Sequence, residues 1–272
     1  MKEPRPYQGG HDLEAMQNLL IAGWQANNGT YYIHTGDLNW WLYYPPLEGD
    51  FWDYIYLWDD PDQPGQLLGW ALRSPDWVGI DVYIQPNLCG SPLAREMYLW
   101  TEEKAVQIAH EHGKSTVYAL WILHDDGVLD NHFRQQGFRL ARGYTHLTRN
   151  LDMALLPAQV KGEFQVRACK GEPEVASRAR AQYGAFGSEA PFERYMERFR
   201  KFMRSTVYCH NLDIVAIAPD GQVGAFCIVW MDSVNQVGLF EPVGTHPDYQ
   251  RKGLGKAVMQ EGLRRMQAGG MK

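Results

Sequence analysis

Apolar and polar positions recur with two different periods along the chain, and the order of these segments predicts the fold. Residues 11–27 and 92–113 carry apolar side chains at the three- and four-residue spacing of amphipathic helices. Between them lie three strand-like runs, at residues 53–60, 67–74 and 77–87, separated by turns rich in proline, glycine and aspartate. The pattern therefore predicts a helix, a three-stranded meander and a long helix, in this order.

The rest of the first half predicts further elements. A buried strand at residues 115–123, a short helix at residues 126–138 and a final strand or hairpin at residues 139–151 are expected. Residues 152–163 show no sustained period and are interpreted as a linker. The first domain is accordingly expected to span residues 1–151.

The pattern then begins again, and a second domain is expected over residues 164–272. It predicts a strand, two helices, a second three-stranded meander and a long helix. These elements are expected at residues 164–169, 172–186, 192–203, 212–218, 223–232, 237–247 and 254–267. We interpret the repetition as a divergent internal duplication. The predicted fold class is α/β (α+β), with two tandem domains that each contain a mixed, mainly antiparallel sheet flanked by helices.

The two halves differ beyond the long helix. The first half continues with further elements, whereas the second stops at "AGGMK". With the first half as a guide, we expect that about forty residues of the second domain are missing, including strands that a sheet of this kind needs. The alternatives are a longer chain and a homo-oligomer in which a second copy completes the sheet.

Composition and charge narrow the class of protein. The 272 residues are enough for two domains, and no apolar run approaches the length of a membrane span. The N-terminus lacks the apolar core of a signal peptide, so a cytoplasmic protein with no membrane partner is expected. A net charge of −6 argues against a nucleic-acid partner. The 4 cysteines form no CxxC pair, which argues against a zinc site and a disulfide framework, and no metal is expected.

Aromatic residues are concentrated in "YYIHTGDLNWWLYYPP", residues 31–46. One interpretation is a packed subdomain or an interface, and the other is an apolar wall for a ligand. If the segment is a wall for a ligand, it would cover the ligand site provided that the two domains face each other. That hypothesis fails if Trp40 and Trp41 are buried in the core of the first domain.

The stretch "HPDYQRKGLGKAV", residues 246–258, has the layout of a loop that binds phosphate. Its glycines let backbone N–H groups converge on an anion, and the helix dipole that begins there favours negative charge. A Walker loop is excluded because Gln250 stands where its first glycine belongs and Ala257 replaces the Ser or Thr. A dinucleotide fingerprint is excluded because Val258 stands where its third glycine belongs.

Gln250, Gly253 and Gly255 match the signature Q/R-x-x-G-x-G/A, and here the sequence resembles the GCN5-related N-acetyltransferase (GNAT) family. The preceding "VGTHPDY" is similar to the end of that family's fourth strand, and the element order of the second half matches the family. The resemblance implies acetyl-CoA (coenzyme A) as cosubstrate. Its pyrophosphate would be held by Gln250, Arg251, Lys252, Gly253, Leu254, Gly255 and Lys256.

The corresponding stretch of the first half, "QPNLCGSPLAREM", has lost this pattern. Only Gly90 remains as a glycine, and Pro92 suits the first turn of a helix better than a row of donors. We therefore expect the first domain to have lost CoA and to be structural or to shape the substrate site.

The resemblance also implies roles on the fourth strand. There a backbone N–H polarises the thioester carbonyl beside a bulge, and Pro242 and Gly244 suit such an irregular strand. By the resemblance, the Val243 N–H would face the carbonyl and Thr245 would pair with the pantetheine arm. Glu241 is the candidate base, with a solvated or salt-bridged glutamate at the strand end as the alternative.

Other candidates are weaker. His246 could titrate near neutrality, although a His-Pro turn is more typical of a cap or a surface element. Asp232 and Glu189 could line an amine pocket, with ordinary surface charge as the alternative. The family's usual general acid is a tyrosine on the helix after the fifth strand, which lies in the region expected to be missing.

The predicted function is acetyl-CoA-dependent N-acetyl transfer to a primary amine of a small molecule. Direct transfer is expected because no cysteine lies in the motif, and Cys227 is interpreted as an apolar core residue. The alternative is a non-catalytic acyl-CoA-binding protein with a regulatory or scaffold role.

Overall fold

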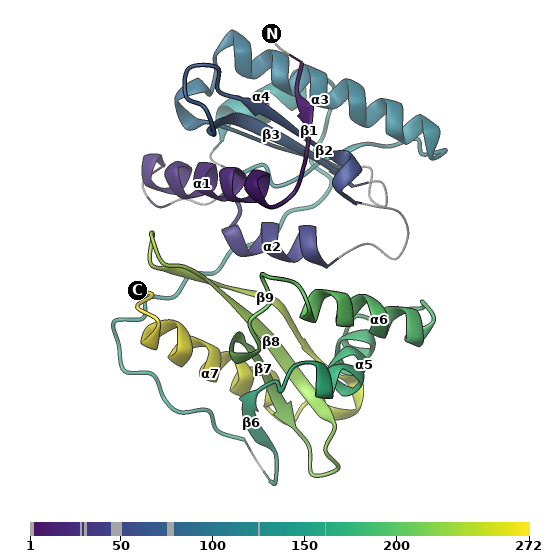
Figure 1. Cartoon of the computed structure of the whole chain (residues 1–272), viewed down its shortest axis with the longest axis vertical. Helices are drawn as coiled ribbons and strands as arrows, with labels where there is room; N and C mark the ends of the chain where they lie inside the picture. Colours follow the sequence, from purple (N-terminus) through teal and green to yellow (C-terminus); the bar gives the residue numbers. More distant parts are fainter. Residues whose placement is uncertain are drawn as a thin grey trace. The chain divides into compact units, whose positions relative to one another are not determined.

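The chain folds into two compact units (Figure 1). The computed structural model describes residues 3–27, 29, 32–44, 51–74, 79–124, 126–160 and 162–272. Unit 1 comprises Met1–His34 and Asp50–Leu147, and unit 2 comprises Thr35–Gly49 and Thr148–Lys272. Residues 35–49 therefore belong to unit 2, although they precede the expected domain boundary at residue 151.

Unit 1 is built on a sheet with the strand order β1-β2-β3-β4-β5, antiparallel except for the parallel pair β4 and β5. Its strands are β1 (Arg5–Pro6), β2 (Ile55–Asp59), β3 (Leu67–Ser74), β4 (Gly79–Ile84) and β5 (Tyr118–Ala119). Its helices are α1 (Gly10–Ala26), α3 (Pro92–Glu111) and α4 (Gly127–Gln135). Apolar residues of β4, α3 and α4 form one core, on the face that carries Ile80 and Val82. Tyr83 points to the other face and contacts Gly23 of α1.

Unit 2 is built on an antiparallel sheet with the strand order β6-β7-β8-β9. Its strands are β6 (Gln165–Ala168), β7 (Asp213–Ile217), β8 (Val223–Asp232) and β9 (Val237–Thr245), and its helices are α2 (Thr35–Tyr43), α5 (Val175–Ala185), α6 (Phe192–Met203) and α7 (Leu254–Ala268). Helix α7 covers one face of this sheet, and α5 and α6 cover the other (Figure 1). Side chains of β8 alternate between the two cores: Phe226 and Ile228 pack with α5 and α6, whereas Cys227 and Val229 pack with α7. Short 3₁₀ turns lie at Phe51–Tyr54, Pro86–Leu88, Glu172–Glu174, His210–Leu212 and Pro247–Tyr249. The two sheets with their flanking helices confirm the predicted fold class.

Strand β9 is bulged, as its sequence predicted. Cys227 of β8 pairs with Val243, and Val229 pairs with Phe240. Glu241 and Pro242 therefore lie opposite the single residue Ile228, which is the two-against-one count of a β-bulge. Proline is tolerated there because it has no N–H to give to the ladder.

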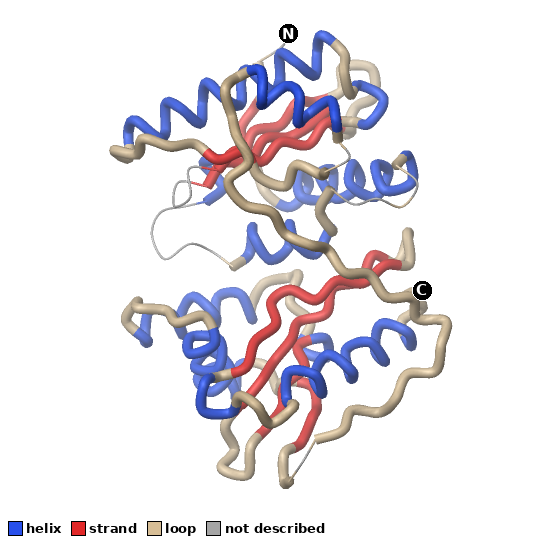
Figure 2. The backbone as a smooth tube through the Cα atoms, turned by 180° about the vertical axis from the view of Figure 1, so that it is seen from behind, coloured by secondary structure: helices blue, strands red, loops and turns tan. Residues whose placement is uncertain are grey.

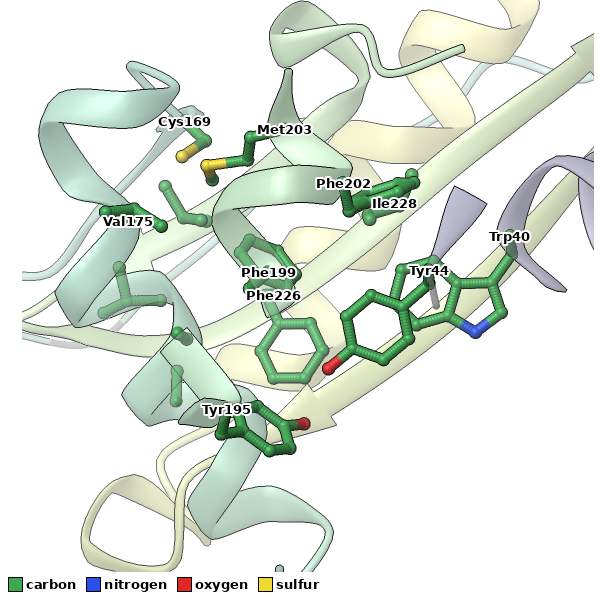
Figure 3. Close-up of a cluster of buried hydrophobic side chains, with 14 of the residues drawn as sticks. Trp40, Tyr44, Cys169, Val175, Tyr195, Phe199, Phe202, Met203, Phe226 and Ile228 are labelled. Carbon is green, nitrogen blue, oxygen red and sulfur yellow. The ribbon is translucent and has the colours of Figure 1, made fainter. Parts of the chain in front are cut away.

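Helix α2 carries the aromatic segment into the core of unit 2. Trp40 and Tyr44 stack with their ring centroids 4.1 Å apart, and both contact Phe202 of α6 edge-on (Figure 3). Trp40 is 9 % exposed, and Trp41 packs against the same cluster. Trp40 is thus buried, and Trp41 partly buried, in the core of the second unit and not of the first. Residues 31, 45 and 46 of the segment lie outside the described residues.

Two expected elements of the first half differ from the structure. Residues 139–151 form no strand, and the strand expected at residues 115–123 is reduced to β5 (Figure 2). Leu140, Tyr144 and Leu147 of this stretch are exposed. A strand persists only when a neighbouring strand pairs its backbone groups, and sequence alternation cannot supply that neighbour. The expected linker, residues 152–163, has no helix or strand in its described part.

Replacing Tyr44 with phenylalanine tests whether α2 is an integral part of unit 2. The Tyr44 hydroxyl accepts a hydrogen bond of 3.2 Å from the buried Gln182 amide of α5. Because Y44F leaves that donor unpaired, we expect unfolding to become easier by about 1 kcal/mol. Urea denaturation measures the change, and Y118F, at an exposed hydroxyl on β5, should stay within about 0.5 kcal/mol of the wild type. Equal effects of both variants would contradict this role of α2.

Candidate functional site

The loop before α7 presents a row of free backbone donors. Arg251 and Gly253 adopt left-handed backbone conformations, with φ of 62° and 79°, and Gly253 is the N-cap of α7 without a side-chain cap. Within the described part of the chain, no amide from Arg251 to Lys256 has a hydrogen-bond acceptor, and the first helical bond runs from Ala257 N to Gly253 O at 3.1 Å. Converging amides at a helix N-terminus are a binding site for an anion such as phosphate.

The side chains of this loop divide into two groups. Leu254 is buried in the core beneath α7, and the Gln250 amide donates a 3.4 Å hydrogen bond to Thr245 O, so both tie the loop to the sheet. Gly255 lies so close to β9 that a Cβ there would be 3.1 Å from Thr245 Oγ1. The exposed cationic side chains are Arg251, Lys252 and Lys256. The loop is thus anchored on one side and positively charged on the other.

Two amides of β9 point away from β8. His246 N donates to Gly224 O at 2.9 Å, and successive residues of an antiparallel strand direct their N–H groups to opposite sides. Gly244 therefore faces β8, whereas Val243 and Thr245 direct their N–H groups to the open edge. Among the described strands none pairs with this edge. The sequence-predicted residues Val243 and Thr245 thus direct their N–H groups to the open edge of β9, the strand that precedes the loop.

Glu241 lies on the bulge, partly buried. Burial raises the pKa of its carboxyl above the ordinary value, and no ion pair involves it in the described residues. Its main-chain oxygen accepts a 2.7 Å hydrogen bond from Trp230 Nε1. A carboxyl whose pKa is raised and which lies on the strand with the open edge is suited to take up a proton as a general base.

The raised pKa of Glu241 predicts how stability depends on pH. A carboxyl with a raised pKa in the folded state favours folding only below its ordinary pKa, and that contribution is lost as pH rises through the raised value. We therefore expect E241Q to gain stability relative to the wild type between pH 4 and pH 8, measured by urea unfolding at both. E189Q removes a carboxyl at an exposed position and is the control. A similar response of both variants would contradict the burial of Glu241.

The other charged candidates have structural positions. His246 Nδ1 accepts a 3.3 Å hydrogen bond from Asp248 N, so this side chain caps the turn that leads to the loop. Asp232 is buried and accepts bonds from Val234 N and from the Asn235 backbone and side-chain amides, which close the turn between β8 and β9. Glu189 is exposed. None of these three lies on the open edge of β9.

The equivalent loop of unit 1 satisfies its own donors. Ser91 is the N-cap of α3, and its side chain accepts a 3.1 Å hydrogen bond from Ala94 N. Pro92 follows at the first turn and has no N–H. Helix α3 therefore offers fewer free donors than α7, in keeping with the sequence of this loop.

Sequence reasoning missed two side-chain contacts inside unit 2. Trp230, which binds the Glu241 carbonyl, and the buried pair of Arg178 and Asp213 make their contacts with residues distant in the sequence. No local pattern marks such contacts.

In the described part of the chain, no helix is long and apolar enough to cross a membrane, and no group of His, Cys, Asp and Glu there could hold a metal ion. All four cysteines are free.

Comparison with known proteins relates the C-terminal part of the chain to one family. Residues 176–272 match the model of the acetyltransferase (GNAT) family, so this part of the chain belongs to that family of acyltransferases. No curated protein matches the sequence.

Solved structures extend the likeness to the whole chain at the level of the fold. A GCN5-related N-acetyltransferase from Sphaerobacter thermophilus is 17 % identical, with a TM-score of 0.59 over 100 % of this chain and 85 % of that one. A tandem GNAT protein from the clavulanic acid biosynthesis pathway is 14 % identical, with a TM-score of 0.59 over 98 % of this chain and 86 % of its own. A glucosamine N-acetyltransferase region of a fungal multi-domain beta-N-acetylglucosaminidase is 14 % identical, with a TM-score of 0.51 over 99 % of this chain and 34 % of its own. The chain therefore has the tandem GNAT fold.

Proposed function

We propose that the protein is an acetyl-CoA-dependent N-acetyltransferase that acts on a primary amine by direct transfer, with its site in unit 2. The observation that carries the proposal is the row of unpaired amides from Arg251 to Lys256, next to the open edge of the bulged strand β9. In this proposal the loop holds the pyrophosphate of CoA. Arg251, Lys252 and Lys256 add positive charge around it.

The edge of β9 supplies the chemistry of the acyl group. The Val243 N–H donates to the thioester carbonyl, which stabilises the negative charge that develops on its oxygen during attack by the amine. Thr245 pairs with the pantetheine arm through the same edge. Direct transfer is favoured because Cys227 is fully buried in the core under α7, where burial raises the pKa of its thiol and leaves it unreactive.

Glu241 is the proposed base. An amine attacks a thioester only in its deprotonated form, so a carboxylate beside the acyl group accelerates the reaction by taking up the proton, directly or through water. Because burial raises the pKa of Glu241, its carboxylate is a stronger base than that of an exposed glutamate. Activity should therefore rise with pH through that raised value, and E241Q should lose this rise.

Isothermal titration with acetyl-CoA, followed by a thiol-release assay with a panel of primary amines, tests the proposal. Binding with release of free thiol supports the enzyme. Binding without thiol release across the panel favours the alternative, an acyl-CoA-binding protein with a regulatory or scaffold role. Absence of binding contradicts both. The same assays at several ionic strengths measure the contribution of the loop cations.

A further inference from the structure

Trp230 of β8 connects helix α2 with the bulge of β9. Its indole is 6 % exposed and lies in the cluster that contains Trp40 and Phe202. Its Nε1 donates a 2.7 Å hydrogen bond to the main-chain oxygen of Glu241. The start of α2 presses against the same side chain, because a Cβ built on Gly36 would lie 2.3 Å from Trp230 Cβ. Trp230 therefore packs against α2 and also donates a hydrogen bond to the bulge of β9.

The hydrogen bond from Trp230 fixes a part of β9 that the ladder leaves free. At a bulge one strand has an extra residue whose backbone groups find no place in the regular ladder. Here the Glu241 carbonyl accepts its hydrogen bond from the Trp230 side chain instead. Pro242 comes next and has no N–H, so the next donor along the strand is the Val243 N–H. The direction of that N–H depends on how the Glu241–Pro242 segment is held.

We propose that Trp230, seated against Gly36 of α2, is a positioning residue for acyl transfer: it holds the bulge so that the Val243 N–H points at the thioester carbonyl. The inference rests on the proposed function of unit 2. It gives the first half of the sequence a part in catalysis, because α2 precedes the family-matched region, residues 176–272. The competing interpretation is that Trp230 only fills the core.

Phe202 separates these two interpretations. Its ring is fully buried in the same cluster, and its centroid lies 6.4 Å from that of Trp230. It cannot form a hydrogen bond with the Glu241 carbonyl, because a phenyl ring has no donor. W230F removes the N–H donor and part of the ring volume, whereas F202L removes ring volume alone. Urea unfolding establishes how much stability each variant loses.

The test uses acetyl-CoA labelled with ¹³C at the thioester carbonyl. Infrared spectra of the complexes report the hydrogen bond to this carbonyl, and steady-state kinetics with an accepted amine give kcat and KM. We expect W230F to shift the carbonyl band to higher wavenumber, because a weaker hydrogen bond to the oxygen raises the C=O stretching frequency. The same variant should lower kcat about tenfold. Its Kd for acetyl-CoA should stay within about threefold of the wild type, because the loop is untouched. F202L should keep the band and change kcat by less than about twofold.

A second pair of variants approaches the same contact from α2. G36A would push Trp230 away from its position and should reproduce the effects of W230F. G10A, at the start of α1 with no atom within 4 Å of its new Cβ, should leave band and kcat unchanged. The inference is overturned if W230F and G36A bind acetyl-CoA with an unshifted band, or if F202L shifts it equally. If the wild type itself does not bind acetyl-CoA, the proposed function fails and the inference falls with it.

Discussion

Replacing Gly253 with valine is expected to weaken the binding of CoA to the protein about 100-fold, because the loop amides would no longer converge. Gly253 is in the left-handed region, with φ of 79°, where a β-branched residue costs about 1–2 kcal/mol. The chain can relieve this strain only by turning the peptide groups on either side of residue 253. Each amide that turns away loses a hydrogen bond to a charged oxygen, worth about 1.5–3 kcal/mol.

Unit 1 offers a matched control for this variant. Gly90, in the corresponding loop, has the same φ of 79°, and neither glycine has an atom within 4 Å of a Cβ built on it. G90V should therefore cost similar stability and leave the affinity for CoA within about twofold of the wild type. Isothermal titration with CoA measures both. Equal losses of affinity in the two variants would contradict the placement of CoA on the loop of unit 2.

The second large effect is expected at the buried ion pair of unit 2. Replacing Arg178 with methionine should lower the free energy of unfolding by about 3–5 kcal/mol, because it leaves an uncompensated charge in the core. Arg178 Nε donates to Asp213 Oδ1 at 2.9 Å, and both side chains are 0 % exposed. Tyr208 donates to the other carboxylate oxygen at 2.9 Å. Urea denaturation at pH 7 measures the loss. R200M, at a partly exposed pair with Glu197, should change stability by no more than about 1 kcal/mol.

The pH dependence of R178M arises from the same pair. Burial raises the pKa of Asp213, while its bonds with Arg178 and Tyr208 oppose that rise. Without Arg178 the carboxyl becomes neutral more readily, so the deficit of R178M should shrink as pH falls toward 5. R178M/D213L, which removes both charges, should recover much of the lost stability. A deficit that stays constant with pH and persists in the double variant would show that packing, and not the buried charge, causes the loss.

Most elements of unit 2 could be predicted because their boundaries are marked locally. Helix α6 and strand β8 begin and end where the sequence predicted, at Phe192–Met203 and Val223–Asp232. The bulge of β9 was marked by Pro242, since proline has no place in a regular ladder. The loop before α7 was marked by glycines and basic residues that sit together in the sequence. In each case the physical cause lies within a few residues of its effect.

The errors and omissions concern contacts between distant residues. The aromatic residues of segment 32–44 predicted burial, but hydrophobicity does not say against what, and α2 packs in unit 2. The alternation in residues 139–151 predicted a strand, but strand formation needs a partner strand. The hydrogen bond from Trp230 to Glu241 also escaped prediction, because it crosses between two strands at an irregular register.

Amide hydrogen exchange in the presence of CoA tests the central claim most directly. The amides from Arg251 to Lys256 lack acceptors in the described structure, so they should exchange fast in the free protein and slow markedly when CoA binds. Pantetheine, which has no pyrophosphate, should leave them fast and protect at most the Val243 and Thr245 amides. Binding of CoA that leaves residues 251–256 unprotected, or protects the α3 loop of unit 1 instead, would contradict the account.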